Sequence, residues 1–395
     1  MLSTRAGKMR TDGKPSVLFV EASEYWGAPE RLLSALLGSE AFRERVDVAA
    51  AVSFGVVYEK LAGLAVFPVF GIPAKRLSKS QGLRFICRGI RGMASTNRQL
   101  GSLLRKLRPD FVHANSLKGA IYAAFASHFR RIPLIWHMHD ILPDDMTNRW
   151  LVRCLARWSE RIVAVSYATG AALCRMGVPP GKIQVVYNGL DPEIWNPSRV
   201  DRTRIREQWN IPPEAVVLLH IGRMTRWKGQ SIFLRAAAAL KDLGAIFFVV
   251  GGPGDRPDDQ VYAKEILQQI SALGDAGRYR SWVEDPQQAY AVADILVHTS
   301  TAEDPLPTVI LEAMALGKPV IAPAVGGPPE LVENNRTGLL FRPCQIEQLG
   351  KAMARLIRDR ALREEMGLAA LQRYASRFTL SHQVQALVEL YHSPQ

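Results

Sequence analysis

Cysteine is scarce and scattered in this sequence of 395 residues. The four cysteines show no C-x-x-C spacing and stand at Cys87, Cys154, Cys174 and Cys344. A structural zinc site or a disulfide framework needs closely spaced or paired cysteines, so neither is expected. The pattern favours a chain that works without a bound metal in a reducing compartment.

Long apolar runs are also missing. The longest uncharged stretch, residues 61–74, has 14 residues and contains two prolines, whereas a membrane-spanning helix needs about 20 apolar residues. Residues 1–14 are basic but lack the apolar segment of a secretory signal. We therefore expect a cytoplasmic protein with a disordered basic lead-in at residues 1–14.

Acidic residues are absent between Glu59 and Asp110, and the charge balance reflects this gap. Residues 1–200 hold 28 Lys and Arg against 15 Asp and Glu, whereas residues 201–395 hold 22 of each. Arginines are interspersed with apolar residues along 75–108, a composition that suits an anionic membrane surface. We predict an anionic or lipid-linked acceptor for the first half, and peripheral contact with the cytoplasmic face of a membrane through 75–108.

Two simpler readings of the charge remain open. A basic face can serve solubility alone. Nucleic-acid binding is suggested only by charge, and the sequence carries no helix-turn-helix, zinc or aromatic stacking signature. We therefore expect no nucleic-acid partner and keep a nucleic-acid-binding protein as a remote alternative.

Strand-like and helix-like segments alternate in two successive series. Short apolar runs bounded by turn residues, such as 16–21 and 216–221, are typical of buried parallel strands. The pattern breaks where Pro, Asn and Asp gather, and then restarts. We predict an α/β fold with two Rossmann-like parallel-sheet domains facing a cleft. The predicted boundaries are 15–190 for the N-terminal domain, 191–200 for a linker or hinge, 201–375 for the C-terminal domain, and 376–395 for a helix packing back toward the N-terminal domain.

Three segments of the second half carry groups suited to a nucleotide. In 220–229 (HIGRMTRWKG), Arg223 and Lys228 follow a strand that ends in glycine, and a diphosphate needs such cations. In 303–320, prolines precede a predicted helix at 308–316, whose first N–H groups would stabilise an anion. Glu312 lies one turn further along and can accept both hydroxyls of a ribose. In 324–332, two glycines permit a close backbone approach. Each segment alone is also compatible with an ordinary turn or helix cap.

The order and spacing of six segments resemble those of the GT-B glycosyltransferases of family 4, the group 1 type. The resemblance covers nearly the whole chain. The six segments are G-A-P-E (27–30), H-M-H-D (137–140), Y-N-G-L-D (187–191), G-R-M-T-R-W-K-G (222–229), E-D-P-L-P-T-V-I-L-E-A-M-A-L-G-K-P-V (303–320) and G-G-P-P-E (326–330).

The resemblance implies a retaining, metal-independent transfer of a hexose-type sugar. The donor would be a nucleotide diphosphate sugar, a UDP- or GDP-sugar, and the acceptor a cell-envelope, lipid-linked or polysaccharide molecule. No Asp-x-Asp motif is present to bridge a metal to the diphosphate. A GT-B enzyme of another reaction, a nucleotide-sugar epimerase or a sugar phosphorylase, is the alternative.

The resemblance also implies roles for individual residues. Arg223 and Lys228 would neutralise the diphosphate, Glu312 would bind the ribose, and His139 would face the transferred sugar. The implied catalytic residues are His139, Arg223, Lys228 and Asp304. The implied donor-binding residues are Gly27, Gly222, Arg223, Lys228, Glu303, Asp304, Leu306, Pro307, Thr308, Val309 and Glu312. Second-tier candidates are His113, His137, Gly326, Gly327 and Glu330.

Two positions depart from the family pattern. Asp304 replaces the usual first glutamate of the E-x7-E motif, so that either Glu303 or Asp304 is expected to contact the sugar. Ala28 and Pro29 stand where a second glycine is common, and the proline removes one N–H donor.

Overall fold

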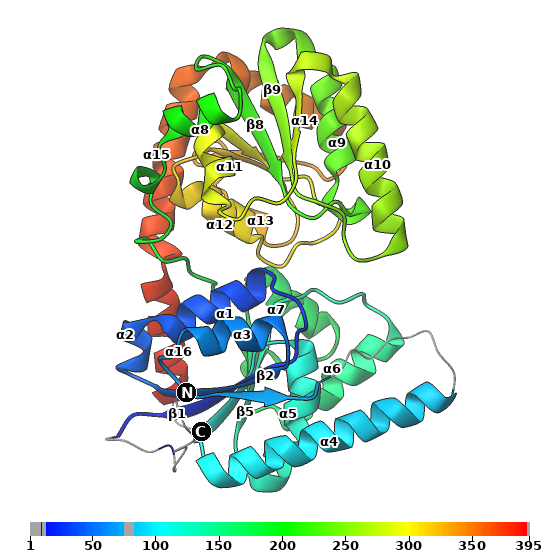
Figure 1. Ribbon diagram of the computed structural model, residues 1–395, viewed down its shortest axis with the longest axis vertical. Coiled ribbons are helices and arrows are strands. Elements are labelled where there is room, and N and C mark those ends of the chain that lie inside the picture. Colours follow the sequence, from blue (N-terminus) through cyan, green and yellow to red (C-terminus); the bar gives the residue numbers. More distant parts are fainter. Residues whose placement is uncertain (1–8, 10–12, 75–82, 393–395) are drawn as a thin grey trace. The chain divides into compact units, whose positions relative to one another are not determined.

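The computed structural model describes residues 9, 13–74 and 83–392, with only the backbone for 83–92. The chain divides into two compact units, each a sheet flanked by helices (Figure 1). Unit 1 comprises Met1–Gly189 and Leu380–Gln395, and unit 2 comprises Leu190–Thr379. The chain therefore passes between units at 189–190 and again at 379–380, and the segment 191–200 belongs to unit 2.

Unit 1 is built on a seven-stranded parallel sheet in the order β3-β2-β1-β4-β5-β6-β7. Its strands are β1 (Ser16–Glu21), β2 (Asp47–Ser53), β3 (Val69–Ile72), β4 (Phe111–Ala114), β5 (Leu134–Met138), β6 (Arg161–Ala164) and β7 (Ile183–Val185). Its helices are α1 (Ala28–Gly38), α2 (Glu40–Arg43), α3 (Val56–Gly63), α4 (Leu83–Leu107), α5 (Leu117–Arg130), α6 (Met146–Trp158), α7 (Tyr167–Arg175) and α16 (Leu380–His392). Alternate residues of β1 enter two different apolar clusters, since successive side chains point to opposite faces.

Unit 2 has a six-stranded parallel sheet in the order β10-β9-β8-β11-β12-β13. Its strands are β8 (Val216–Ile221), β9 (Ala245–Val250), β10 (Gly277–Arg280), β11 (Ile295–Val297), β12 (Val320–Pro323) and β13 (Gly338–Phe341). Its helices are α8 (Arg202–Gln208), α9 (Gln230–Ala238), α10 (Pro257–Ala272), α11 (Gln287–Val292), α12 (Thr308–Ala315), α13 (Pro328–Leu331), α14 (Ile346–Arg358) and α15 (Arg360–Arg377).

The predicted class of two doubly wound parallel-sheet domains is confirmed. Three strands, β3, β7 and β10, have no counterpart in the sequence prediction. All three lie at the edge of their sheet and are only partly buried. An edge strand faces less of the core, so it lacks the continuous apolar run by which the central strands are recognised.

Helix α16 returns to unit 1 after the whole of unit 2. It is the red helix beside α1 and α2 in Figure 1. Its side chains Leu387, Val388 and Leu390 are buried among the residues of β1 and β2. Unit 1 is therefore completed by the last segment of the chain.

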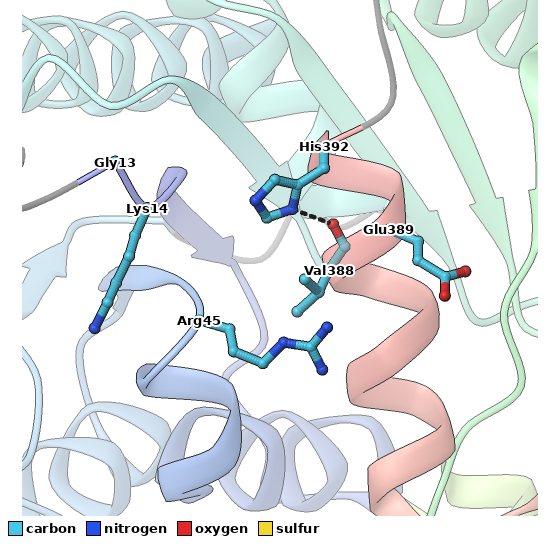
Figure 2. A pocket seen from close by; sticks show the side chains of 6 residues that line it. All are labelled: Gly13, Lys14, Arg45, Val388, Glu389 and His392. Atoms are coloured by element: carbon cyan, nitrogen blue, oxygen red, sulfur yellow. Dashed lines mark hydrogen bonds between the residues drawn. The ribbon is translucent and has the colours of Figure 1, made fainter.

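A hollow of about 460 Å³ lies at the C-terminal end of α16 and is lined by Lys14, Arg45 and His392 (Figure 2). His392 Nδ1 donates to the Val388 carbonyl at 2.8 Å, a side-chain hydrogen bond within the last turn of the helix. Positive side chains at a helix C-terminus complement the helix dipole. Lys14 and Arg45 precede β1 and β2. The hollow therefore lies at the amino ends of the strands, away from the carboxyl ends where ligands are expected.

The basic stretch 75–108 falls partly outside the described residues, at 75–82. In the described part of α4, Leu100, Leu104 and Leu107 are buried in the core of unit 1, whereas Arg105 and Lys106 are exposed. The large apolar side chains from residue 93 onward therefore pack in the core, and the exposed residues there are polar or basic apart from Ala94. In the parts of the chain that the structure describes, no helix combines the length and apolarity needed to cross a membrane.

The strand orders mark where ligands are expected. In each sheet, successive strands are first added toward one side and then toward the other. The change occurs between β1 and β4 in unit 1 and between β8 and β11 in unit 2. In open α/β sheets, ligands bind beyond the carboxyl ends of the strands at such a switch point. The segments after β1, β4, β8 and β11 are therefore the places to examine.

Candidate active site

In unit 2 the loops that follow β8 and β11 bring a lysine and an aspartate together. Lys228 Nζ donates to Asp304 Oδ2 at 2.6 Å, and the two side chains are only 19% and 7% exposed. Lys228 Nζ also lies 4.0 Å from the centroid of the Trp227 ring, a cation–π geometry. The largely buried Lys228 ammonium is thus contacted by the Asp304 carboxylate and by the Trp227 ring at the switch point.

Asp304 is charged in spite of its burial. Burial by itself raises the pKa of this carboxyl group, but the Lys228 ammonium holds the pKa well below its usual range. Ser300 Oγ donates to the same oxygen, Oδ2, at 3.4 Å. Among the described residues Oδ1 has no hydrogen-bond partner, so this carboxylate keeps one oxygen able to accept a bond from a ligand.

His298 lies beside this pair. Its Nε2 is 3.5 Å from Asp304 Oδ2, too long for a normal hydrogen bond, and it has no other partner although it is buried. Burial lowers the pKa of His298. The ring is therefore neutral at pH 7, and Lys228 is the charge that balances Asp304.

Arg223 offers a second cation on the β8 loop. Its side chain is exposed, and no side-chain partner is found for it in the described part of the chain. Gly222, the residue before it, continues the edge of the sheet by donating its N–H to the Val250 carbonyl at 3.0 Å. The loop therefore presents one guanidinium to solvent and one ammonium to a buried carboxylate.

Helix α12 begins directly after the Asp304 segment. Pro307 is the N-cap and Thr308 is the first helical residue, as in the helix predicted at 308–316. Thr308 and Val309 are half-buried at this end, while Leu306 is buried. The orphan N–H groups of the first turn and the positive end of the helix dipole lie there, which suits an anion.

Glu312 is fixed one turn into the same helix. It is 3% exposed, and the Tyr290 hydroxyl donates to its Oε2 at 2.6 Å. Tyr290 belongs to α11, which precedes β11, so two different segments of unit 2 orient this carboxylate.

The two glycines of the 326–330 segment serve packing. A Cβ at Gly326 would come within 2.7 Å of the Asp304 carbonyl, and one at Gly327 within 2.2 Å of the Pro305 carbonyl. Gly326 has φ +71°, and the Gly327 N–H donates to the Asp304 carbonyl at 2.7 Å. The glycines therefore let this loop support the backbone that carries Asp304. Glu303 and Glu330 are half-buried nearby.

In unit 1 the corresponding edge holds a buried carboxyl group. Glu21, the last residue of β1, is 0% exposed. Its oxygens accept from Asn115 Nδ2 at 3.0 Å, Ser116 Oγ at 2.9 Å and the Ser23 N–H at 2.9 Å. Burial, and then the negative charge of Glu30, raise the pKa of Glu21, although these donors counteract the shift. Glu30 in turn accepts from the Gly27 N–H at 2.8 Å at the start of α1.

Two buried histidines, the half-buried His139 and a buried tyrosine form an array on the same edge. Tyr391 Oη lies 2.6 Å from His113 Nδ1, and His113 Nε2 lies 3.1 Å from His137 Nδ1. The rings of His137 and His139 stack with centroids 4.3 Å apart. Burial, followed by the charge of His139, lowers the pKa of His113 to about 3, and burial lowers that of His139 to about 4. At pH 7 the whole array is neutral.

The hydrogen bonds around Asn115 assign the proton on His139. Because Asn115 Nδ2 donates to Glu21, its Oδ1 faces His139 Nε2 at 3.3 Å and acts as the acceptor. His139 therefore carries its proton on Nε2. Its Nδ1, which has no partner among the described residues, is left as a hydrogen-bond acceptor.

The structure thus separates the predicted residues into two groups. Lys228, Asp304 and the N-terminus of α12 lie at the unit 2 edge, and His113, His137 and His139 lie at the unit 1 edge. Sequence reasoning missed Glu21, Asn115, His298 and Tyr290. The first three end or immediately follow a central strand, and that position is a signal that would have found them.

Two family models match the chain. One, described as glycosyl transferases group 1, matches residues 201–373, and one described as glycosyltransferase family 4 matches residues 70–194. Together they cover most of both units. The chain is a GT-B glycosyltransferase of the group 1, family 4 type. The predicted family and enzyme class are confirmed.

Curated relatives of the glycosyltransferase support this assignment. Sulfoquinovosyl transferase SQD2 of Arabidopsis thaliana is 28% identical over 285 residues, 68% of this chain and 54% of that protein. D-inositol 3-phosphate glycosyltransferase 1 of Catenulispora acidiphila is 29% identical over 306 residues, 72% of each chain. These relatives have different names, so the transferase class follows from them but no single substrate does.

A solved structure matches the enzyme over almost its whole length. Anabaena Alr3699/HepE in complex with UDP has a TM-score of 0.81 and 26% identity, covering 95% of this chain and 99% of that one. The complex of the same protein with UDP-glucose has a TM-score of 0.80. Within the described residues of the glycosyltransferase, no group of three or more His, Cys, Asp or Glu is placed to hold a metal ion.

Proposed function

We propose that this glycosyltransferase transfers a hexose-type sugar from a UDP-sugar and retains the anomeric configuration. The observation that carries the proposal is the Lys228–Asp304 pair at the β8/β11 switch point, beside the exposed Arg223 and the N-terminus of α12. The UDP and UDP-glucose complexes of Anabaena Alr3699/HepE favour a uridine donor over a guanosine one.

The diphosphate of the donor would bind between the cations of the β8 loop and the first turn of α12. Arg223 supplies planar N–H donors and Lys228 a point charge, and both stabilise the charge that develops as the nucleotide leaves. With these groups present, the reaction needs no metal to neutralise the leaving group. Glu312, oriented by Tyr290, would accept the ribose hydroxyls.

Asp304 is proposed as the acid that contacts the transferred sugar. Its Oδ2 is engaged by Lys228, whereas Oδ1 can accept a hydroxyl of the sugar. Glu303 is the neighbouring alternative, and Glu303→Gln provides the matched control for Asp304→Asn. In unit 1, His139 Nδ1 is proposed to accept a hydrogen bond from a substrate hydroxyl.

The acceptor is proposed to be a hydroxyl of a lipid-linked, cell-envelope or polysaccharide molecule. Exposed basic residues of α4 such as Arg98, Arg105 and Lys106 support contact with an anionic surface. Vesicle flotation at low salt tests this part. Equal recovery with neutral and anionic vesicles would remove the membrane from the proposal and leave the transfer reaction untouched.

The reaction itself is tested by incubating the full chain with UDP-, GDP- and ADP-sugars and a panel of acceptors. We expect acceptor-dependent release of UDP, and an α-linked product from an α-linked donor by NMR. An inverted product would refute retention. An epimerised donor formed without acceptor, or sugar 1-phosphate formed with inorganic phosphate, would show that the chain catalyses one of the other GT-B reactions.

A further inference from the structure

A second cationic cavity lies at the opposite edge of the unit 2 sheet. Its volume is about 530 Å³, and it is lined by residues that precede β8, β11 and β12 and by the first turn of α15. Its charged lining consists of the cations Arg202, Arg206, Lys318, Arg360 and Arg363 and the carboxylates Glu214, Asp294 and Glu364, of which Glu364 pairs with Arg360. Lys228 and Asp304 follow the carboxyl ends of β8 and β11, so the cavity is separate from the proposed donor site.

Part of this cluster is structural. Arg206 bonds the carbonyls of Pro212, Pro213 and Val292 and the carboxylate of Asp294, which uses all its donors. Asp294 also accepts from Arg202 at 2.7 Å and from the Val217 N–H at 2.8 Å. The negative charge of Asp294 is therefore committed to two arginines and a strand end.

Lys318 is left without an acceptor. It follows α12 and lines the cavity, yet none of its three ammonium N–H donors has a hydrogen-bond partner among the described residues. Burial first, and then repulsion from Arg202 and Arg206, lower its pKa to about 8, and Asp294 offsets this only in part. The ammonium is thus charged at pH 7 and has no hydrogen-bond acceptor among the described residues.

Arg363 adds donors on the other wall of the cavity. Its Nη1 bonds the carbonyls of Leu356 and Ile357 at the end of α14, whereas Nε and Nη2 have no acceptor among the described residues. Arg363 lies in the first turn of α15, an 18-residue helix whose positive dipole end is at this wall. Two side chains with unused donors therefore line one hollow with an excess of positive charge.

We propose that this cavity binds the phosphate group of a small phosphorylated molecule, with Lys318 and Arg363 as the recognising donors. A phosphate offers the oxygen acceptors that both side chains lack and neutralises the repulsion among Lys318, Arg202 and Arg206. The volume lies in the range of small-molecule sites, so a sugar phosphate fits as well as a free anion.

Inorganic pyrophosphate is the probe, measured by titration calorimetry on the full chain with and without saturating UDP. Without UDP, both sites can take pyrophosphate. With UDP present, we expect one remaining site, because the cavity lies at the edge of the sheet away from the donor. Complete displacement of pyrophosphate by UDP would overturn the proposal, and this arm needs no variant.

Variants then locate the remaining site. Lys318→Gln is expected to weaken pyrophosphate binding in the presence of UDP by about tenfold, since a charge-assisted hydrogen bond is lost. Lys264→Gln, an exposed lysine of α10, is the matched control and should bind like the wild type. Equal affinity of the Lys318 and Lys264 variants would refute the site.

Lys228→Gln distinguishes a failure of the proposed donor site from a failure of the cavity proposal. This variant should lose UDP binding and still bind pyrophosphate in the cavity. The remaining pyrophosphate affinity of this variant should match that of the wild type with UDP. Loss of pyrophosphate binding in this variant would mean that the donor site alone takes the anion. Unchanged UDP affinity would instead contradict the donor site and leave the cavity proposal standing.

Discussion

The two sheets are alike in topology, yet their ligand-binding edges differ in charge. In unit 2 the switch point holds an ion pair, Lys228 and Asp304, with the exposed Arg223 beside it. In unit 1 it holds neutral histidines and the buried Glu21. The net charge of the two halves follows the opposite order. Residues 1–200, which include the neutral switch point, carry the whole positive excess.

This contrast teaches that the charge of a domain does not reveal the chemistry of its site. The described basic residues of α4, such as Arg98, Arg105 and Lys106, are exposed, whereas burial removes the charge of His113, His137 and His139. A charged edge suits the diphosphate, and a neutral edge rich in hydrogen-bonding groups suits sugar hydroxyls. The following experiments test this division, from the largest expected effect to the smallest.

The charged edge is tested first by Lys228→Gln. We expect kcat to fall about 10²- to 10³-fold, because a group that stabilises the leaving charge is removed. Arg226→Gln is the matched control, since Arg226 lies on the same loop in an exposed pair with Glu265 and should change little. Initial rates at saturating donor give kcat for the two variants. An equal loss of kcat in Lys228→Gln and Arg226→Gln would contradict the role of Lys228.

Asp304→Asn tests the acid of the same pair. We expect a loss of kcat of about 10²-fold, because the variant leaves Lys228 without its counter-charge and weakens the contact with the sugar. Glu303→Gln should keep most of the activity. If Glu303→Gln were the more damaged variant, the sugar contact would belong to Glu303.

The ribose contact is tested by Glu312→Gln. The amide oxygen can still accept from Tyr290, so the fold is preserved, but the charged acceptor is lost. We expect the Kd for UDP to rise about tenfold with little change in kcat, because this interaction forms in both the ground state and the transition state. Calorimetry with UDP measures the change. A loss of kcat at unchanged Kd would place Glu312 in the chemical step.

The neutral edge is tested through the proton on His139. In Glu21→Gln the side chain at position 21 can donate as well as accept, so Asn115 is free to turn over and offer its amide N–H to His139. We expect the Nε2-H form of His139 to be lost by ¹⁵N NMR, with kcat reduced about tenfold. Glu44→Gln, an exposed glutamate of unit 1, is the control. Unchanged histidine spectra would rule out this positioning role.

The same histidines predict a pH-dependent stability of unit 1. Their folded pKa values, about 3 for His113 and about 4 for His139, lie below the unfolded value of 6.5. The unfolded chain therefore binds more protons between these values, and stability falls as the pH drops below about 6.5. We expect a loss on the order of 2 kcal/mol per histidine at pH 5. Hydrogen exchange of β4 and β5 measures it, and equal protection at pH 7.5 and pH 5 would contradict the neutral array.

The sequence by itself determined the class of fold and the family. Central parallel strands are buried on both faces, so they appear in the sequence as continuous apolar runs. Cations next to a glycine turn indicate an anion site. Lys228 was predicted in this way, Glu312 from its place in the helix at 308–316 and Asp304 from the resemblance to the family, and their roles stay predictions. The edge strands were not, because partial burial leaves no such pattern.

Only the tertiary structure decided which of these groups meet. The pairing of Lys228 with Asp304 spans 76 residues, and that of Tyr391 with His113 spans 278. The sheet order, rather than the sequence, places Glu21 beside Asn115 and thereby fixes the proton on His139. Parallel strands gather their carboxyl ends at one edge whatever their separation along the chain, and that is why local patterns named most of the residues but not their partners.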